Sequence, residues 1–234
     1  MGNLPSSRIE PARPFLHSDI NFCGPLLVHN KIRGKQPIKV YLAVFCCFAT
    51  KTVHLEVVGD LSTDAVIGAL KRFLGRRGHC KSLHCDNATN FVGANNKLNE
   101  LLSSLHAAKS QETIITTCAN VEIQFNFIPP RAPHFGGLWE AAVKSAKHLL
   151  MRCVATASLT YEELQTVVIE IEATLHSRPL TPLSSNANDY TALTPGHFLI
   201  GEPPTGDVTT NQLQAGLLTR WKLVSHLKHQ LWNR

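Results

Sequence analysis

Acidic residues are scarce in this chain. Its 234 residues include 17 Asp and Glu against 23 Lys and Arg, which gives a formal net charge of +6. A basic balance favours an anionic partner, and nucleic acid is the first candidate. Charged residues at 17% and hydrophobic residues at 44% exclude a disordered chain and indicate a globular fold with an ample core.

Long apolar runs are also missing. The longest, "VYLAVFCCFA" at residues 40–49, is too short to span a bilayer and is typical of a buried strand. The first 15 residues lack the apolar segment of a secretory signal. We therefore expect an intracellular protein, in the nucleus or the cytoplasm, with no membrane partner.

The seven cysteines form no C-x-x-C pair. An odd count without regular spacing argues against a disulfide framework and favours reduced, mostly buried thiols. His79-Cys80 and His84-Cys85 resemble part of a zinc cluster, but no second ligand pair has the spacing of a structural site. We interpret them as the flanks of a short strand.

Hydrophobic periodicity predicts alternating strands and helices. Strands are expected at 15–22, within 38–58 as a hairpin broken near Ala49-Thr50-Lys51, at 81–85 and at 121–127. Helices are expected at about 62–77, 95–107, 137–153 and 160–176, with caps at Ser62 and at the Thr160/Glu163 capping box. This order predicts an α/β domain with a mixed sheet flanked by helices.

Three polar positions could meet at one edge of that sheet. They are Asn21 (or Asp19), Asp86 at the end of a strand, and Glu140 in the first turn of a helix. Each also has a simpler explanation, because Asp86-Asn87 could form a turn and Glu140 could interact with its helix dipole. Lys144 and Lys147 follow Glu140 on the same helix face, and either track a phosphate backbone or form a surface pair with it.

Several long phrases carry a more specific signal. "NFCGPL", "FCCFATKTVHLEVVGDLSTDAVIGALKRFLGRRG", "DNATNFVGANN", "FIPPRAPHFGGLWEAAVKSAKHLL" and "ALTPGHFLIGEP" closely resemble the integrase region of BEL/Pao-type LTR retrotransposons. The resemblance covers nearly the whole chain. It implies a ribonuclease H-like fold, DNA as partner and an Asp-Asp-Glu site that holds two Mg²⁺ or Mn²⁺ ions for DNA integration. It also implies a homo-oligomer.

The resemblance assigns roles to residues. Asp86 and Glu140 match the second and third acidic positions and would bind the metal ions. Lys144 and Lys147 match lysines that contact the element's DNA end, and Asn87 and Arg131 are further candidate DNA contacts. Gly136-Gly137 would be a flexible segment beside the site. We expect residues 1–14 to be an extended lead-in, 15–178 the integrase core, and 179–234 a C-terminal extension that begins a basic region.

The sequence departs from the family at the first acidic position, where Asn21 replaces Asp in the pattern Asp-aromatic-x-Gly-Pro. Asp19 shares the strand face but lies about 6.6 Å away at ~3.3 Å per residue. That exceeds the roughly 3.5–4 Å between paired metals, so Asp19 is a poor replacement. We expect strand transfer to be severely reduced or absent, and the alternative is a decayed or domesticated nucleic-acid-binding protein without catalysis.

Two further differences concern the family pattern. His176 stands where the family usually has Asn before Ser-Arg-Pro-Leu. A His-His-Cys-Cys zinc module usually precedes this region and a basic domain usually follows it. Because neither is complete in this sequence, we expect full integration to be weaker still.

Overall fold

A computed structural model describes residues 6–31, 34–86, 89–107, 123–127, 137–154, 158–186, 188–205 and 219–232. Its centre is a five-stranded sheet with the order β3-β2-β1-β4-β5. The strands are β1 (His17–Val28), β2 (Ile38–Cys47), β3 (Val53–Val58), β4 (Ser82–Cys85) and β5 (Gln124–Phe127). The pairs β1/β2 and β2/β3 are antiparallel, whereas β1/β4 and β4/β5 are parallel. The predicted mixed sheet is confirmed.

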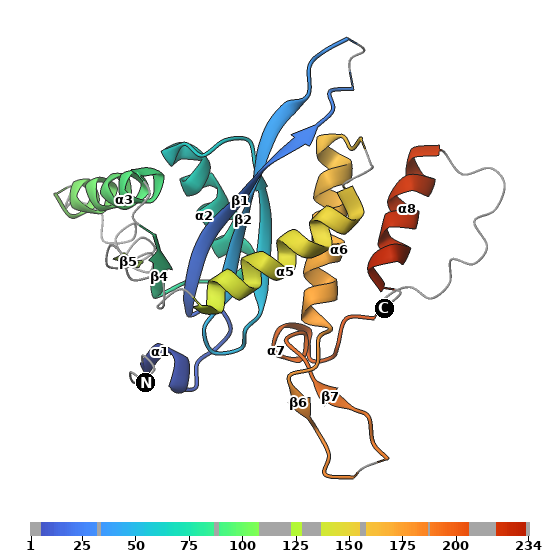
Figure 1. The fold of residues 1–234 in the computed structure, drawn as a ribbon. Helices are drawn as coiled ribbons and strands as arrows, with labels where there is room; N and C mark the ends of the chain where they lie inside the picture. Colours follow the sequence, from blue (N-terminus) through green and yellow to red (C-terminus); the bar gives the residue numbers. More distant parts are fainter. Residues whose placement is uncertain are drawn as a thin grey trace.

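Helices cover both faces of the sheet (Figure 1). They are α1 (Ser6–Ile9), α2 (Thr63–Arg77), α3 (Thr89–Ala107), α5 (Gly137–Val154), α6 (Tyr161–His176), α7 (His197–Ile200) and α8 (Thr219–Trp232). A small two-stranded sheet, β6 (Thr181–Pro182) with β7 (Ala192–Leu193), projects from the body. None of the helices in the described ranges is long and apolar enough to cross a membrane.

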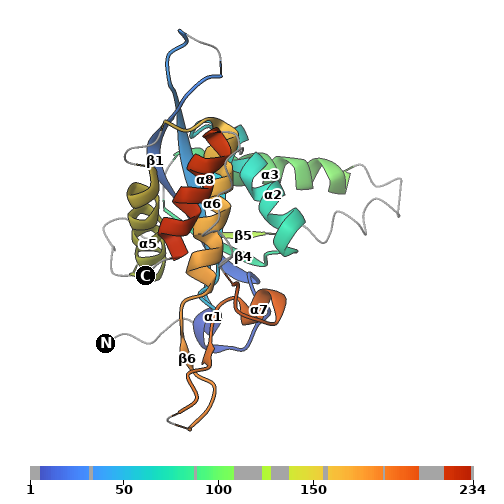
Figure 2. The ribbon, with the colours of Figure 1, turned by 90° about the vertical axis from the view of Figure 1, so that its right-hand side faces the viewer.

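Two hydrophobic cores lie on opposite faces of the sheet. One joins the sheet to α2 and α3, and it contains Phe15, Phe45, Phe73 and Phe91. The other joins the sheet to α5, α6 and α8, and Figure 2 shows α8 lying alongside α6. Leu227 and Leu231 of α8 belong to this second core. The face with α5 and α6 is the one that carries the candidate site.

The predicted helix caps are present. The Ser62 hydroxyl accepts a hydrogen bond from the backbone N–H of Ala65 at the start of α2. At the start of α6, Thr160 and Glu163 form the full capping box, with each side chain bonded to the other's backbone N–H. These local signals depend on residues three apart, which is why the sequence predicts them well.

The strand predicted at residues 15–22 does not stop before Gly24-Pro25 but runs from His17 to Val28. The pairing with β2 shifts register between Cys23 and Leu26. Gly24 and Pro25, which lie between them, therefore form a bulge and do not end the strand. Gly24 has φ of 140°, and a Cβ there would lie 2.9 Å from the Tyr41 ring. Only glycine fits this close approach without strain.

Two other boundaries differ from expectation. Helix α3 starts at Thr89 instead of about residue 95, so most of "DNATNFVGANN" is helical rather than a loop. Phe91 and Ala94 explain the earlier start, because both are buried against the sheet. The stretch expected to be an extended lead-in contains the single helical turn α1.

A buried ionic cluster fastens α2 to the edge strand β3. His54 and Glu56 project from one face of β3 and are both nearly inaccessible to solvent. Glu56 accepts from Arg72 at 2.7 Å and from Arg76 at 2.9 Å. Burial opposes ionisation of Glu56, but His54 and Arg72 outweigh it and hold the pKa of Glu56 below its usual value. On this face of β3, the ion pairs of Glu56 with Arg72 and Arg76 therefore join the strand to α2, where apolar contacts usually join a strand to a helix.

Helix α6 covers the free edge of β3 with polar side chains. Glu172 accepts a hydrogen bond from the backbone N–H of Leu55 at 2.7 Å and forms an ion pair with Arg77. The Nε2 atom of His176 lies 3.1 Å from the N–H and 2.7 Å from the C=O of Val53. An exposed edge strand is a template for unwanted pairing, and these side chains occupy its backbone groups.

Candidate functional site

Strands β1 and β4, which are neighbours in the sheet, position two of the predicted site residues, Asn21 and Asp86. Asp19 pairs with His84, and these strands run parallel. This is the last pair of the ladder; Asn21 lies two residues further along β1, and Asp86 lies two residues beyond His84 in the chain. Asp86 follows the last residue of β4 and is exposed. The end of a parallel strand is a common position for polar site residues in α/β sheets.

Asn21 is half-buried on the face of β1 that α5 crosses. Its side-chain oxygen accepts a hydrogen bond from the backbone N–H of Phe22 at 2.8 Å. The amide oxygen is therefore engaged by its own strand. A neutral amide in this position brings no negative charge that could hold a cation.

Glu140 lies in the first turn of α5, which packs against β1 and β2, and its side chain is exposed. The sheet and α5 thus supply two carboxylates, Asp86 and Glu140, and one amide, Asn21. Across the described ranges, no group of three His, Cys, Asp or Glu side chains is arranged to hold a metal ion. Mg²⁺ and Mn²⁺ favour carboxylate oxygens, so this set of side chains does not fit a two-metal site.

Asp19 is the nearest other acid and is sealed inside the protein. It is 1% exposed, and neither carboxylate oxygen has a hydrogen-bond partner in the described structure. Burial raises the pKa of Asp19 well above its usual value, and the nearby backbone N–H groups of Asp19 and Cys46 offset this only in part. A carboxylate with so little access cannot replace the missing ligand at Asn21 without movement of the strand.

Lys144 and Lys147 are exposed on α5. Lys147 lies close enough to Cys23 of β1 for its positive charge to lower the pKa of that thiol, although burial dominates and raises it to about 11. No ion pair joins Glu140 to Lys144, and in the described part of the chain neither lysine has an acidic partner. The surface-pair explanation of this spacing is therefore not realised.

These lysines line a groove of about 550 Å³ between α5 and the end of α6. The basic residues that line the groove are Lys144, Lys147, His148 and Arg178, and among the described residues no acidic side chain lines it. Met151 and Leu175 give it an apolar part. No pattern in the sequence indicates a role for Arg178 in this groove. Arg178 is half-buried and donates a hydrogen bond to the backbone oxygen of Lys51 at 2.5 Å.

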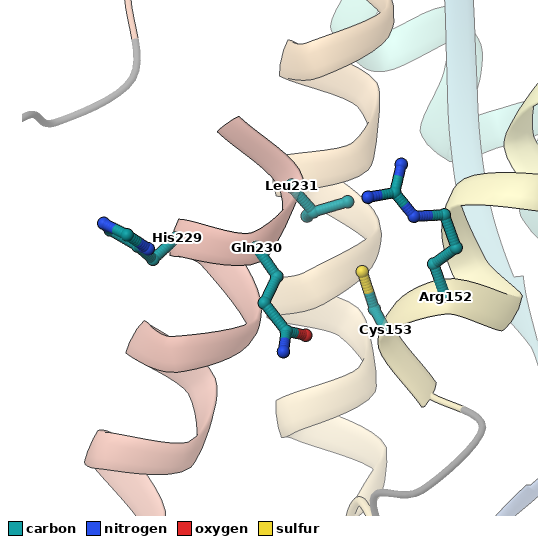
Figure 3. Close-up of a pocket in the computed structure, with 5 residues that line it drawn as sticks. All are labelled: Arg152, Cys153, His229, Gln230 and Leu231. Atoms are coloured by element: carbon teal, nitrogen blue, oxygen red, sulfur yellow. The ribbon is translucent and has the colours of Figure 1, made fainter. Parts of the chain in front are cut away.

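A second hollow, of about 370 Å³, lies between the end of α5 and α8 (Figure 3). Arg152, Cys153 and Leu231 face one another there, whereas His229 points away. Burial raises the pKa of the Cys153 thiol, which makes it a poor nucleophile. This hollow lies at the opposite end of α5 from Glu140, so we do not assign it to the candidate site.

Three predicted positions cannot be placed. Asn87, Arg131 and Gly136 lie outside the residues that the structure describes. Gly137 is the first residue of α5. The proposed DNA contacts at Asn87 and Arg131, and the flexible segment at Gly136-Gly137, remain predictions.

No protein-family model matches this chain, and no curated protein sequence matches it. Among solved structures, a chain from the cryo-electron microscopy structure of the simian T-cell lymphotropic virus intasome, in complex with PP2A regulatory subunit B56 gamma, is similar with a TM-score of 0.50. The identity is 14%, over 85% of this chain and 59% of that chain. At this identity the likeness shows the fold alone. The chain has an integrase-like, ribonuclease H-like fold.

Proposed function

We propose that this protein is the integrase-type core of a BEL/Pao-like LTR retroelement, that it binds nucleic acid along the α5–α6 groove, and that its metal-dependent chemistry is impaired at Asn21. The integrase-like fold supports the general class. The sequence phrases around Asn21, Asp86 and Glu140 support the narrower assignment. Both lines of support are independent of the net charge.

The observation that carries nucleic-acid binding is the composition of the groove. Lys144, Lys147 and Arg178 line it together, and no acidic side chain competes for them there. Cations that contact phosphates release counterions from the nucleic acid, which makes binding favourable and dependent on salt. Lysines without ion-pair partners are available for this role.

The second candidate function is nucleic-acid binding without catalysis, on the same fold. The state of Asn21 favours it, because its amide oxygen is held by the backbone N–H of Phe22. Among the described residues, no three His, Cys, Asp or Glu side chains are arranged to hold a metal ion. Metal ions in such a site would activate the attacking oxygen and stabilise the leaving one, but this set of side chains does not fit them. We therefore derive no catalytic step for the chain with Asn21 in place.

Fluorescence anisotropy with labelled duplex DNA in a salt series tests the binding proposal. We expect Lys144→Ala with Lys147→Ala to weaken binding and to make the slope of log K against log salt concentration shallower by about 1.8 for two lost phosphate contacts. The matched control is Lys71→Ala with Lys81→Ala, since both lysines are exposed on other elements. If the slope of log K against log salt concentration is the same for the two double variants, the groove does not bind DNA and this part of the proposal is wrong.

A further inference from the structure

The segment from Ile20 to Leu55 contains no acidic residue but includes the lysines of the β1–β2 hairpin. We propose that this hairpin, here called the β-arm (residues 26–31 and 34–40), is a second nucleic-acid contact that binds the phosphate backbone through Lys35 and Lys39. The proposal rests on the proposed function, because it adds a binding surface to the same protein. It assigns a role to residues outside the groove and the candidate metal site.

The β-arm extends beyond the packed sheet, and Figure 1 shows it rising past the ends of the helices. The solvent exposure of its side chains differs sharply between neighbouring positions. Val28 and Val40 are buried against the core that includes α6, whereas Leu27 is 57% and Ile38 is 51% exposed. The two strands stop pairing at Val28 and Ile38, so the β-arm consists of a short paired ribbon with one face open to solvent and of residues 29–31 and 34–37 beyond it.

The base of the β-arm is fixed to the body. The backbone N–H of His29 donates to the backbone oxygen of Leu159 at 2.8 Å. The Lys31 ammonium forms an ion pair with Glu162 of α6 at 2.6 Å. A contact surface that is held in place before binding loses less conformational freedom when it binds.

Two lysines of the β-arm are available to contact phosphates. Lys35 and Lys39 are exposed, and in the described ranges neither has an ion-pair partner. Lys39 lies opposite Leu27 across the two strands, on the open face. Lys31 is not included, because Glu162 already balances its charge.

The shape and the charge of the β-arm favour nucleic acid over other anions. A two-stranded ribbon is narrow enough to enter the major groove of B-form DNA, which is about 12 Å wide. Lys39 on the paired ribbon and Lys35 just beyond it would meet the phosphates that border the groove and fix the position of the β-arm without reading sequence. An acidic protein segment is the alternative ligand for the β-arm, and the experiment below distinguishes it from nucleic acid.

The test uses the full chain and labelled duplex DNA, with binding measured by anisotropy over a KCl series. Lys35→Ala with Lys39→Ala is expected to make the salt slope shallower by about 1.8, while Lys71→Ala with Lys81→Ala leaves it unchanged. Because all four side chains are exposed, the thermal midpoints of both variants should match that of the unmodified protein. Lys144→Ala with Lys147→Ala is measured in the same series.

The outcomes separate the two proposals. If the β-arm variant matches the control while the groove variant loses affinity, the β-arm proposal is overturned and the proposed function stands. If the unmodified protein does not bind the duplex, both fall. If labelled polyglutamate binds as tightly as DNA and depends equally on Lys35 and Lys39, the arm is a protein-binding surface and the nucleic-acid assignment is wrong.

Discussion

Asp19 and Cys46 lie directly opposite each other on the paired strands β1 and β2, and both side chains are sealed from solvent. Burial raises the pKa of each group. The charge of Asp19 raises the pKa of the Cys46 thiol further, whereas the backbone N–H of Cys46 partly lowers the pKa of Asp19. Asn21 lies two residues further along the same strand face, at the position where the BEL/Pao-type pattern that the sequence resembles has an acid. The strand therefore holds a carboxyl group, but at a position where it cannot reach solvent or a metal ion.

Asp19 should make the protein less stable as the pH rises. Its pKa is higher in the folded chain than in the unfolded chain, so stability is fully present below the unfolded value near 4 and is lost as pH rises through the folded value. Asn cannot ionise, so the free energy of unfolding of Asp19→Asn should exceed that of the unmodified protein by about 1–3 kcal/mol at pH 8. At pH 4 the two free energies of unfolding should differ little. Urea titrations at pH 4, 6 and 8 measure this.

The exposed acid Asp64 provides the control for that measurement, since its side chain is 79% exposed. The stability difference between Asp64→Asn and the unmodified protein should not widen above pH 6 in the way expected for Asp19→Asn. A difference for Asp19→Asn that stays constant from pH 4 to pH 8 would show that Asp19 is ionised in the folded protein.

Glu172 should contribute far more to stability than an exposed glutamate on the same helix. It is 13% exposed and contacts His54, Arg77 and the backbone N–H of Leu55. Removing one partner from a buried ion pair leaves the others uncompensated, so Glu172→Ala should cost about 3–5 kcal/mol. Glu162→Ala breaks only the exposed pair with Lys31 and should cost about 0–1 kcal/mol. Chemical denaturation of both variants compares them, and equal losses would contradict the packing described for α6.

His176 should be replaceable by Asn but not by Ala. A neutral imidazole nitrogen can either donate or accept, so Nε2 satisfies only one of the two backbone groups of Val53 at a time, whereas an amide offers both. We expect His176→Ala to lose about 1–3 kcal/mol and His176→Asn to retain the stability of the unmodified protein at pH 7.5. Thermal melts of both variants test this.

The pH dependence of His176 provides a second test. Burial lowers the pKa of His176 below its usual value, so the histidine's contribution to stability falls as the pH drops below about 6.5. His176→Asn should therefore become the more stable protein between pH 6.5 and pH 5. If the two melting curves shift in parallel over that range, His176 does not bind Val53 as a neutral ring.

Local patterns predicted much of the fold. The Ser62 cap and the Thr160/Glu163 capping box each depend on residues a few positions apart, and each is present. Gly24-Pro25 follows the strand predicted at 15–22, and the sequence pattern favours a strand end there because both residues disfavour strands. The bulge exists because Tyr41, on the neighbouring strand, packs against Gly24. That contact is invisible to a local pattern.

The polar interior was the harder part to predict. His54 and Glu56 alternate with apolar residues and would suit a solvent-facing strand, yet both are buried because Arg72, Arg76 and Glu172 reach them from two helices. The position of Arg178 in the groove could not be predicted either, because it depends on how α5 and the end of α6 pack together. Side chains that meet only after the helices pack leave no periodic signal in the sequence.

The central claim is that the chain has an integrase-like fold whose metal-dependent chemistry is impaired because Asn21 has replaced the first acid. The most direct measurement is oligonucleotide strand transfer with Mn²⁺, comparing the unmodified protein with Asn21→Asp, and using Asn21→Asp with Asp86→Asn as the inactive control. We predict that Asn21→Asp forms product at least about tenfold faster than the unmodified protein, and that the added Asp86→Asn abolishes the gain. Equal rates for the unmodified protein and Asn21→Asp would contradict the account.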